Sequence, residues 1–321
     1  MRHRQGRSQD AVNHLLDAVR LADAAGAPEV LATALVHLDI AELTLGREGG
    51  SEHASRALEI LRRLGDQPWL EARALNQLGI RAYFAGNWSQ AVDFYTQSCD
   101  ACRRAGDEWT AAVGAGNIAE VLADQGHLAR AETMLEEALR TYQAAGTPTF
   151  IGYGTMLLGR LAARRGDTER ALALLDQARA LSASEGETLQ LLQSDAARAE
   201  ALLLAEDFAS AIEVAHQVLR DAASSPGSDL LVAWMERVMA LARAGRGEDS
   251  TRVAEHLRAS VEIARRRGAR YELALSLNAL ADLWPSAGPG VRRESLELFD
   301  QLGVVETARS LGRLTSAQAP G

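Results

Sequence analysis

Glycines recur along this chain at a nearly constant interval of 40 residues. One series comprises Gly6, Gly46, Gly86, Gly126 and Gly166. A second, offset series comprises Gly26, Gly65, Gly106, Gly146, Gly186, Gly227 and Gly268. A fixed period of this kind is typical of repeat proteins, in which each unit packs mainly against its neighbours. The spacing therefore predicts a stack of similar units.

The stretch from Leu75 to Asp107 shows what one unit contains. Its first half is apolar up to Gly86, and Asn87 can cap the next helix. Its second half carries one apolar face at the spacing of a helix with 3.6 residues per turn, formed by Ala91, Phe94, Tyr95, Ser98 and Cys102. The same stripe recurs from Ala11, Ala131, Ala171 and Ala211. Each unit is thus a first helix, a turn glycine and a second helix.

The interval also divides the chain into segments. Residues 1–27 are expected to be a half repeat that contains only a second helix, and residues 28–267 to be six helix pairs. Residues 268–311 are expected to form a degenerate C-terminal capping pair, and residues 312–321 a disordered tail. Proline prefers the first turn of a helix, and Pro28, Pro68 and Pro148 stand where first helices are expected to begin.

Stacked pairs of this kind predict an all-α, right-handed superhelical solenoid with a concave inner groove. The half repeat at the N-terminus presents Ala11, Leu15, Ala18 and Ala22 to a neighbouring helix on one side only. No polar cap covers its other side. Exposed repeat faces associate readily. We therefore expect this end either to fray or to form a homodimer.

Composition limits the kinds of partner. The chain has 321 residues, 47% hydrophobic and 24% charged, with a net charge of -9. An acidic balance argues against general binding to nucleic acid or to anionic membranes. No apolar run approaches the roughly 20 residues needed to span a bilayer, and no signal peptide is recognisable. The presence of only two cysteines predicts a cytoplasmic location.

The alternation of small and large residues resembles the tetratricopeptide repeat over essentially the whole chain, although the period is longer than the usual 34 residues. It is carried by Leu78-Gly79, Ala82, Ala91 and Tyr95. Strings such as NQLGIRAYFAGNWSQAVDFY and GRLAARRGDTERALALLDQAR also resemble the C-terminal repeat region of large actinobacterial adenylate or guanylate cyclases and related ATP-binding regulators. That resemblance implies a sensing or scaffolding arm.

In such proteins the repeats follow a nucleotide-cyclase domain and a P-loop ATPase domain. The motifs of both catalytic domains are missing from this sequence. A phosphate-binding G-x-x-x-x-G-K-[ST] loop needs a lysine, and the chain contains none. The strand-like alternation of a cyclase domain is also missing. We therefore expect no catalytic residues, no cofactor and no metal. The alternatives are the effector-binding arm of a transcriptional activator and, less favoured, an enzyme with an unrecognised groove site.

Two motifs that suggest chemistry fit better as packing. Cys99 and Cys102 form a C-x-x-C without a second pair for zinc. Gly114-Ala115-Gly116-Asn117-Ile118-Ala119 mimics a dinucleotide-binding fingerprint, but it lies inside an expected helix rather than after a strand. Both motifs occupy core columns of the repeat. Trp69 and Trp109 precede first helices and are expected to be packing staples.

The expected binding surface is the groove, which should hold a protein segment, a peptide or a small effector. Its lining is predicted from the first-helix positions beside the Leu-Gly column: Arg73, Asn76, Tyr83, Glu120, Asp124, Tyr153, Arg160, Arg164, Gln193 and Glu200. This mixture of both charges with tyrosine suits a polar partner.

The unit at 188–225 departs from the pattern. Asp195 and Arg198 fall in the columns of Leu75 and Leu78, and Glu206 stands at a turn-glycine position. Either the two charges pair with each other at a local weak point, or a small register shift turns them outward.

Overall fold

The computed structural model describes residues 2–44, 51–223, 225, 228–284 and 288–305. These residues form 15 helices and contain no β-strand. The first helices of the repeats are α2 (Pro28–Thr44), α4 (Pro68–Phe84), α6 (Glu108–Gln125), α8 (Pro148–Arg164), α10 (Thr188–Leu204), α12 (Asp229–Gly245) and α14 (Arg270–Leu283). The second helices are α1 (Arg2–Ala24), α3 (Ser51–Leu64), α5 (Trp88–Arg104), α7 (Leu128–Ala144), α9 (Thr168–Glu185), α11 (Phe208–Ala222), α13 (Ser250–Arg266) and α15 (Pro289–Leu302).

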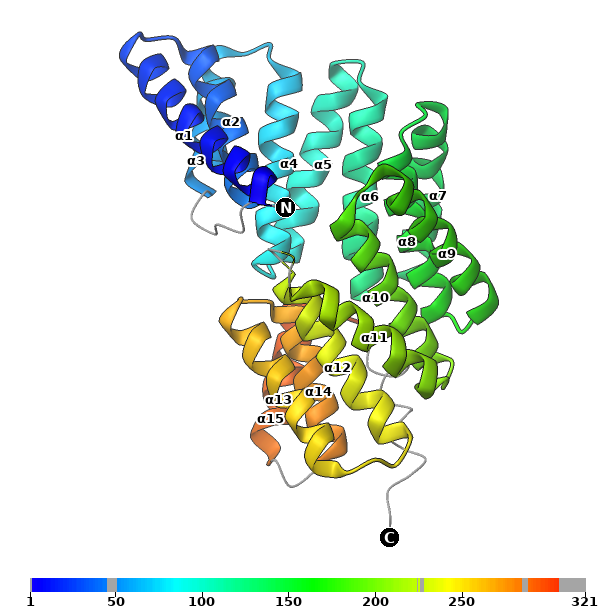
Figure 1. The fold of residues 1–321 in the computed structure, drawn as a ribbon. Helices are drawn as coiled ribbons and strands as arrows, with labels where there is room; N and C mark the ends of the chain where they lie inside the picture. The colour runs from blue at the N-terminus through cyan, green and yellow to red at the C-terminus, as the bar shows by residue number, and fades with distance from the viewer. Residues whose placement is uncertain (1, 45–50, 224, 226–227, 285–287, 306–321) are drawn as a thin grey trace. The chain divides into compact units, whose positions relative to one another are not determined.

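The chain divides into two compact units, residues 1–118 (unit 1) and residues 119–321 (unit 2), and each is described by itself. In Figure 1 the helices of unit 1 run from blue to cyan and those of unit 2 from green to orange. Successive helices pack against each other from α1 to α5 in unit 1 and from α7 to α15 in unit 2, so that each pair covers the apolar face of the next. This confirms the all-α stack of tetratricopeptide-like pairs. The handedness of the superhelix stays a prediction. Within the described residues, no helix combines the length and the apolar character needed to cross a membrane.

The turns between paired helices require a left-handed backbone. Gly86, Gly126 and Gly166 have φ values of 73°, 94° and 85°. Glu206 occupies the same position in the next unit and has a φ of 61°. A side chain in this conformation costs about 1–2 kcal/mol, because Cβ approaches the following carbonyl oxygen. Glu206 therefore replaces the turn glycine without changing the turn.

Two first helices approach their second helices closely at a glycine. A Cβ added at Gly79 would lie 2.5 Å from the Tyr95 ring, and one added at Gly159 would lie 2.8 Å from Cγ of Leu175. Both distances are shorter than any normal contact. The small residue in this column is therefore needed for the helices of a pair to pack.

The two chemically suggestive motifs are part of the packing. Gly114 lies within α6, and a Cβ there would be 2.6 Å from the Cys99 sulfur. Cys99 and Cys102 are buried and unbridged, and the Cys99 thiol donates to the Ala111 carbonyl at 3.3 Å. Burial raises the pKa of Cys102 to about 11, so this thiol stays protonated at neutral pH. Low reactivity is the consequence.

Two details of the repeat pattern were predicted wrongly, the turn at Gly6 and the buried face of α1, and the glycine turn near residue 245 lies at Gly247. Gly6 lies within α1 rather than in a turn, because an isolated glycine costs a helix only about 1 kcal/mol. Gly245 ends α12 as a packing residue, since a Cβ there would meet the Phe208 ring at 2.5 Å, and Gly247 takes the left-handed turn with a φ of 68°. The α1 face is also rotated slightly, because Val12 is buried where Ala11 was expected. Gly46, Gly227 and the predicted tail at 312–321 lie outside the described residues.

Asp195 and Arg198 do not pair with each other. Asp195 accepts a hydrogen bond from Arg179 Nε at 2.8 Å, and Arg198 lies 3.6 Å from Asp176. Both partners belong to α9, the preceding second helix. The side chains of Asp195 and Arg198 are 18% and 38% exposed, while the adjacent Ala196 and Ala197 fill the core. The local rotation of α10 therefore turns the charges outward.

The end of α6 contacts the end of α15, the last helix of unit 2. Gln125, the final residue of α6, donates from its side-chain amide to the Leu302 carbonyl at 2.9 Å. Its own carbonyl accepts a hydrogen bond from the Val305 amide at 2.8 Å. These two bonds fix the end of α15 against the end of α6. The sequence separation of 177 residues places this contact beyond the reach of any local sequence pattern.

Candidate functional site

Seven of the ten predicted binding residues lie in unit 2, on α6, α8 and α10. Six of them belong to one continuous group of polar side chains, which we call the polar network. It consists of Glu120, Asp124, Tyr153, Arg160, Arg164, Glu200, Trp234, Arg237 and Glu272. All of them stand on first helices of successive pairs.

The part of the network between α6 and α8 is formed by predicted residues. The Tyr153 hydroxyl donates to Glu120 at 2.7 Å. Arg160 and Arg164 both donate to the same oxygen of Asp124, at 3.3 Å and 3.0 Å. Arg164 also donates to the Ala123 carbonyl at 2.8 Å. Asp124 is only 2% exposed, so two guanidiniums hold one buried carboxylate.

The part between α10, α12 and α14 centres on Arg237, the largest fully buried side chain of the described structure. Arg237 donates from Nε to Glu272 at 2.6 Å and lies 3.5 Å from Glu200. Glu200 also accepts a hydrogen bond from the Trp234 indole at 3.1 Å. The Arg160 guanidinium lies 5.1 Å from the centre of the Trp234 ring, which joins this part to α8.

The electrostatics of the network follow from burial and from opposed charges. Burial raises the pKa of Glu120, and the neighbouring Asp124 adds to the effect. Burial alone would also raise the pKa of Glu200, but the three guanidiniums of Arg237, Arg164 and Arg160 outweigh it, and the pKa of Glu200 falls below its usual value. The pKa values of these two buried glutamates are therefore shifted in opposite directions.

The arginines remain charged for the same reason. Burial alone would lower the pKa of Arg160 and of Arg237, but the carboxylates beside each of them raise it instead. Even so, Nε of Arg160 and Nη1 of Arg237 are buried and have no hydrogen-bond partner among the described residues. A buried donor without an acceptor costs free energy, so the charge pairs of the network form at some expense of hydrogen bonding.

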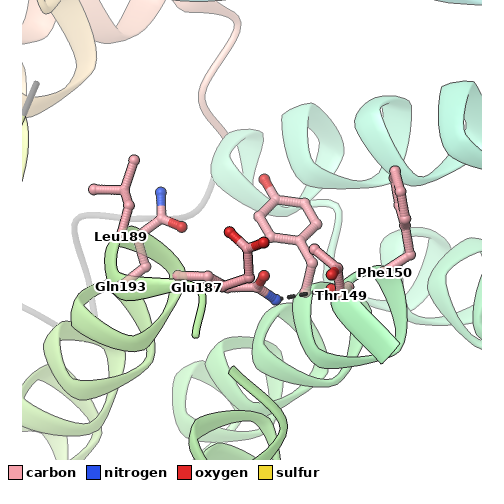
Figure 2. A pocket seen from close by; sticks show the side chains of 7 residues that line it. Thr149, Phe150, Glu187, Leu189 and Gln193 are labelled. Atoms are coloured by element: carbon pink, nitrogen blue, oxygen red, sulfur yellow. Dashed lines mark hydrogen bonds between the residues drawn. The ribbon is translucent and has the colours of Figure 1, made fainter. Parts of the chain in front are cut away.

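Gln193 lies apart from the network, beside a small hollow between the N-terminal turns of α8 and α10. The hollow has a volume of about 220 Å³ and is lined by Thr149, Phe150, Tyr153, Glu187, Leu189, Gln190 and Gln193. Figure 2 shows Leu189 and Gln193 on the side of α10 and Thr149 and Phe150 on the side of α8. Sites for whole small-molecule ligands measure about 300–1,000 Å³. This hollow is large enough for a single side chain rather than a cofactor.

The remaining three predicted residues lie on α4 in unit 1. Asn76 accepts a hydrogen bond from Asn117 on α6 at 2.9 Å. Tyr83 stacks on Trp88, with ring centres 5.8 Å apart. Arg73 stacks over the ring of Trp69 at 4.9 Å. Trp69 is 46% exposed, so its predicted role as a packing staple is wrong.

Sequence reasoning missed Trp234, Arg237, Glu272 and Asn117. A signal existed for Trp234, because Tyr153, Gln193 and Trp234 follow one another at intervals of 40 and 41 residues. No such signal marked Arg237, because it stands among core residues of α12. Among the described residues, no group of three or more His, Cys, Asp and Glu side chains is arranged to hold a metal ion. The arrangement offers paired charges, amides and aromatic rings, which suit binding.

No protein-family model and no curated protein sequence matches the chain. Its fold is similar to solved structures. A Rap protein complexed with competence and sporulation factor has a TM-score of 0.65 at 15% identity, covering 89% of this chain and 75% of the Rap protein. NprR in complex with its cognate peptide NprX has a TM-score of 0.66 at 14% identity, covering 91% of this chain and 88% of NprR.

Aspartyl phosphate phosphatase F from Bacillus subtilis is also similar, with a TM-score of 0.62 at 12% identity, covering 89% of this chain and 76% of the phosphatase. At these identities the similarity shows the fold alone. The chain is therefore a helical repeat protein of tetratricopeptide-like pairs, similar in fold to these three.

Proposed function

We propose that this protein is a non-catalytic interaction and sensor scaffold that binds a peptide or a protein segment along its first helices. The observation that carries the proposal is the polar network, in which side chains from five successive first helices meet. Solenoids of this kind commonly bind extended partners along the surface that such helices form.

Two structural neighbours support the peptide class of ligand. The NprR structure contains its cognate peptide NprX, and the Rap structure contains competence and sporulation factor. Both ligands belong to those neighbours. Together with the network, they favour a peptide over a small effector for this chain.

The wider role is a further part of the proposal. A regulatory repeat arm of a cyclase or ATPase signalling protein rests on the sequence resemblance only. An effector-binding arm of a transcriptional activator, with its DNA-binding domain elsewhere, is the alternative from another class. An enzyme is the least favoured alternative, although one neighbour is named as a phosphatase. The cytoplasmic location likewise stays a prediction.

The predicted homodimer through the N-terminal end is a separate proposal. Leu16 and Leu21 on α1 are 46% and 65% exposed, and Val30 on α2 is 58% exposed. Exposed apolar residues near one end of a repeat stack favour self-association. Light scattering of the 321-residue chain tests it, and a monomer at high concentration would contradict it.

The test of peptide binding is calorimetric titration of the full chain with pools of synthetic pentapeptides. We expect the double variant Tyr83→Ala with Arg160→Ala to lose about 2 kcal/mol or more of binding free energy if these residues are hot spots. Gln193→Ala should weaken peptide binding less than the double variant does. Its effect on folding should be small, because Gln193 has no hydrogen-bond partner among the described residues. Arg265→Ala on second helix α13 is the matched control, since this exposed arginine pairs only with Glu294. No binding by any pool would contradict the proposal.

A further inference from the structure

Arg73 has an unusual setting in unit 1. It lies four residues after Trp69 on α4, so the two side chains stand above one another on the same helical face. Its guanidinium carbon is 4.9 Å from the centre of the Trp69 ring. Stacking on an aromatic face orients a guanidinium without using its hydrogen-bond donors. The edge of the Arg73 guanidinium is therefore left to contact a partner.

Arg73 differs from the arginines of unit 1 that form ion pairs with carboxylates. Arg81 donates to the buried Asp39 at 2.8 Å, and Arg104 donates to Glu71 at 2.9 Å. No carboxylate of the described residues forms an ion pair with Arg73. Burial lowers the pKa of Arg73, and no acidic neighbour opposes that effect.

A shortage of acids does not explain the missing partner. The chain contains 43 acidic and 34 basic residues. A partly buried cation usually acquires a counter-charge, because desolvation of a charge is unfavourable. In this chain the half-buried guanidinium points to a counter-charge that another molecule supplies.

Amides lie beside Arg73. Asn76, three residues further along the same face of α4, accepts from Asn117 through its side-chain oxygen at 2.9 Å. Its amide nitrogen has no hydrogen-bond partner among the described residues. An asparagine with its oxygen occupied can still donate to a peptide carbonyl. A cation followed by a neutral donor matches a peptide that carries one negative charge.

We propose that Arg73, held over Trp69, is the recognition point for a carboxylate of the bound peptide, with Asn76 donating to the adjacent peptide backbone. This inference rests on the proposed function, since it assigns chemistry to one part of the peptide surface. A carboxylate fits better than a phosphate, because a single guanidinium in a chain of net charge -9 offers too little positive charge for a dianion.

The carboxylate can come from the peptide C-terminus or from an Asp or Glu side chain, and three pentapeptide pools separate these sources. The first pool has free C-termini and no Asp or Glu. The second has amidated C-termini and one Asp or Glu per peptide. The third has amidated C-termini and no acidic residue. Each pool is titrated calorimetrically into the full chain, into Arg73→Gln and into Arg104→Gln, the matched control whose arginine already pairs with Glu71.

We expect wild-type protein to bind the first or the second pool more tightly than the third. Arg73→Gln should weaken that binding by about tenfold to hundredfold, the equivalent of one charge-assisted hydrogen bond. The same substitution should leave binding of the third pool unchanged, and Arg104→Gln should bind all pools as wild type does. Arg73→Lys keeps the charge without the planar fork and should retain part of the affinity.

Three results would overturn the inference. If all pools bind wild type equally, the peptide function stands but the carboxylate site does not. If Arg73→Gln binds the acidic pools as tightly as wild type, the carboxylate is recognised elsewhere. If no pool binds, both the site and the proposed function fail. Equal thermal midpoints of Arg73→Gln and wild type by circular dichroism show that folding is not the cause of any loss.

Discussion

Arg237 on α12 donates to Glu272 on α14 across 2.6 Å, and both side chains are removed from solvent for most of their surface. The same arginine reaches Glu200 on α10, so one side chain connects three first helices. In most repeat proteins the contacts between successive pairs are apolar. Here unit 2 adds a line of charge pairs to its apolar core, and this line forms its candidate site.

The first prediction concerns this arginine. Arg237→Met keeps the apolar stem but leaves two buried carboxylates without their shared cation. We expect the free energy of unfolding to fall by about 3–5 kcal/mol, the usual cost of removing one partner from a buried pair. Urea denaturation measures the change.

Two companion variants test the cause of that loss. Adding Glu272→Gln to Arg237→Met should recover part of it, because one uncompensated charge is removed. Arg265→Ala breaks an exposed pair and should cost less than about 1 kcal/mol. Equal effects of the buried and the exposed substitution would contradict the role of burial.

The second prediction concerns pH and Glu120. Its pKa in the folded state is raised above the ordinary value of 4.5. The folded state therefore binds the proton more tightly, and stability from this group is present below pH 4.5 and lost as the pH rises through the folded-state pKa. Glu120→Gln cannot ionise but still accepts the Tyr153 hydrogen bond. It should be more stable than wild type at neutral pH, and this advantage should vanish below pH 4.5.

Glu200 should behave in the opposite way. Its folded-state pKa is lowered, so its contribution is present above pH 4.5 and is lost as the pH falls through the folded-state pKa. Glu200→Gln should be less stable than wild type at neutral pH, with the deficit shrinking in acid. Urea midpoints measured from about pH 3 to pH 8 for both variants check the two signs. If the urea midpoints of both variants differ from wild type with the same sign at neutral pH, the assigned pKa shifts are wrong.

The third prediction concerns the turn at Glu206. Replacing Glu206 with glycine removes a side chain from a left-handed conformation with a φ of 61°. We expect the protein to gain about 1 kcal/mol of stability. Gly166→Ala, in the same position of the preceding unit, should lose stability by a similar amount, because its φ is 85° although no atom lies within 4 Å of the added Cβ. Thermal unfolding of the two variants gives both values.

The fourth prediction concerns the contact between α6 and the end of α15. Gln125→Ala removes the side-chain hydrogen bond to the Leu302 carbonyl and leaves the backbone bond to Val305 in place. The net loss should be about 1 kcal/mol. Hydrogen exchange should become faster at residues 298–305 and remain unchanged at residues 229–245. Faster exchange in both segments would indicate a general destabilisation instead.

Several parts of the protein follow from the sequence alone. Local backbone chemistry repeats with the glycines, so the period, the paired helices and the left-handed turns at Gly86, Gly126, Gly166 and Glu206 could be predicted. Side-chain spacing on a helix is also local. Glu120, Arg160 and Glu200 could therefore be placed on one column of successive first helices, at intervals of 40 residues.

The partners of these residues could not be predicted, because they depend on how each helix is rotated against its neighbour. Arg237 stands among core residues of α12, and only the packed structure places two carboxylates beside it. A small rotation of α10 likewise decided that Asp195 faces Arg179 rather than Arg198. Gln125 meets residues 302–305 only after the helices of unit 2 have packed. The sequence determined the positions along each helix, and tertiary packing decided which charges meet.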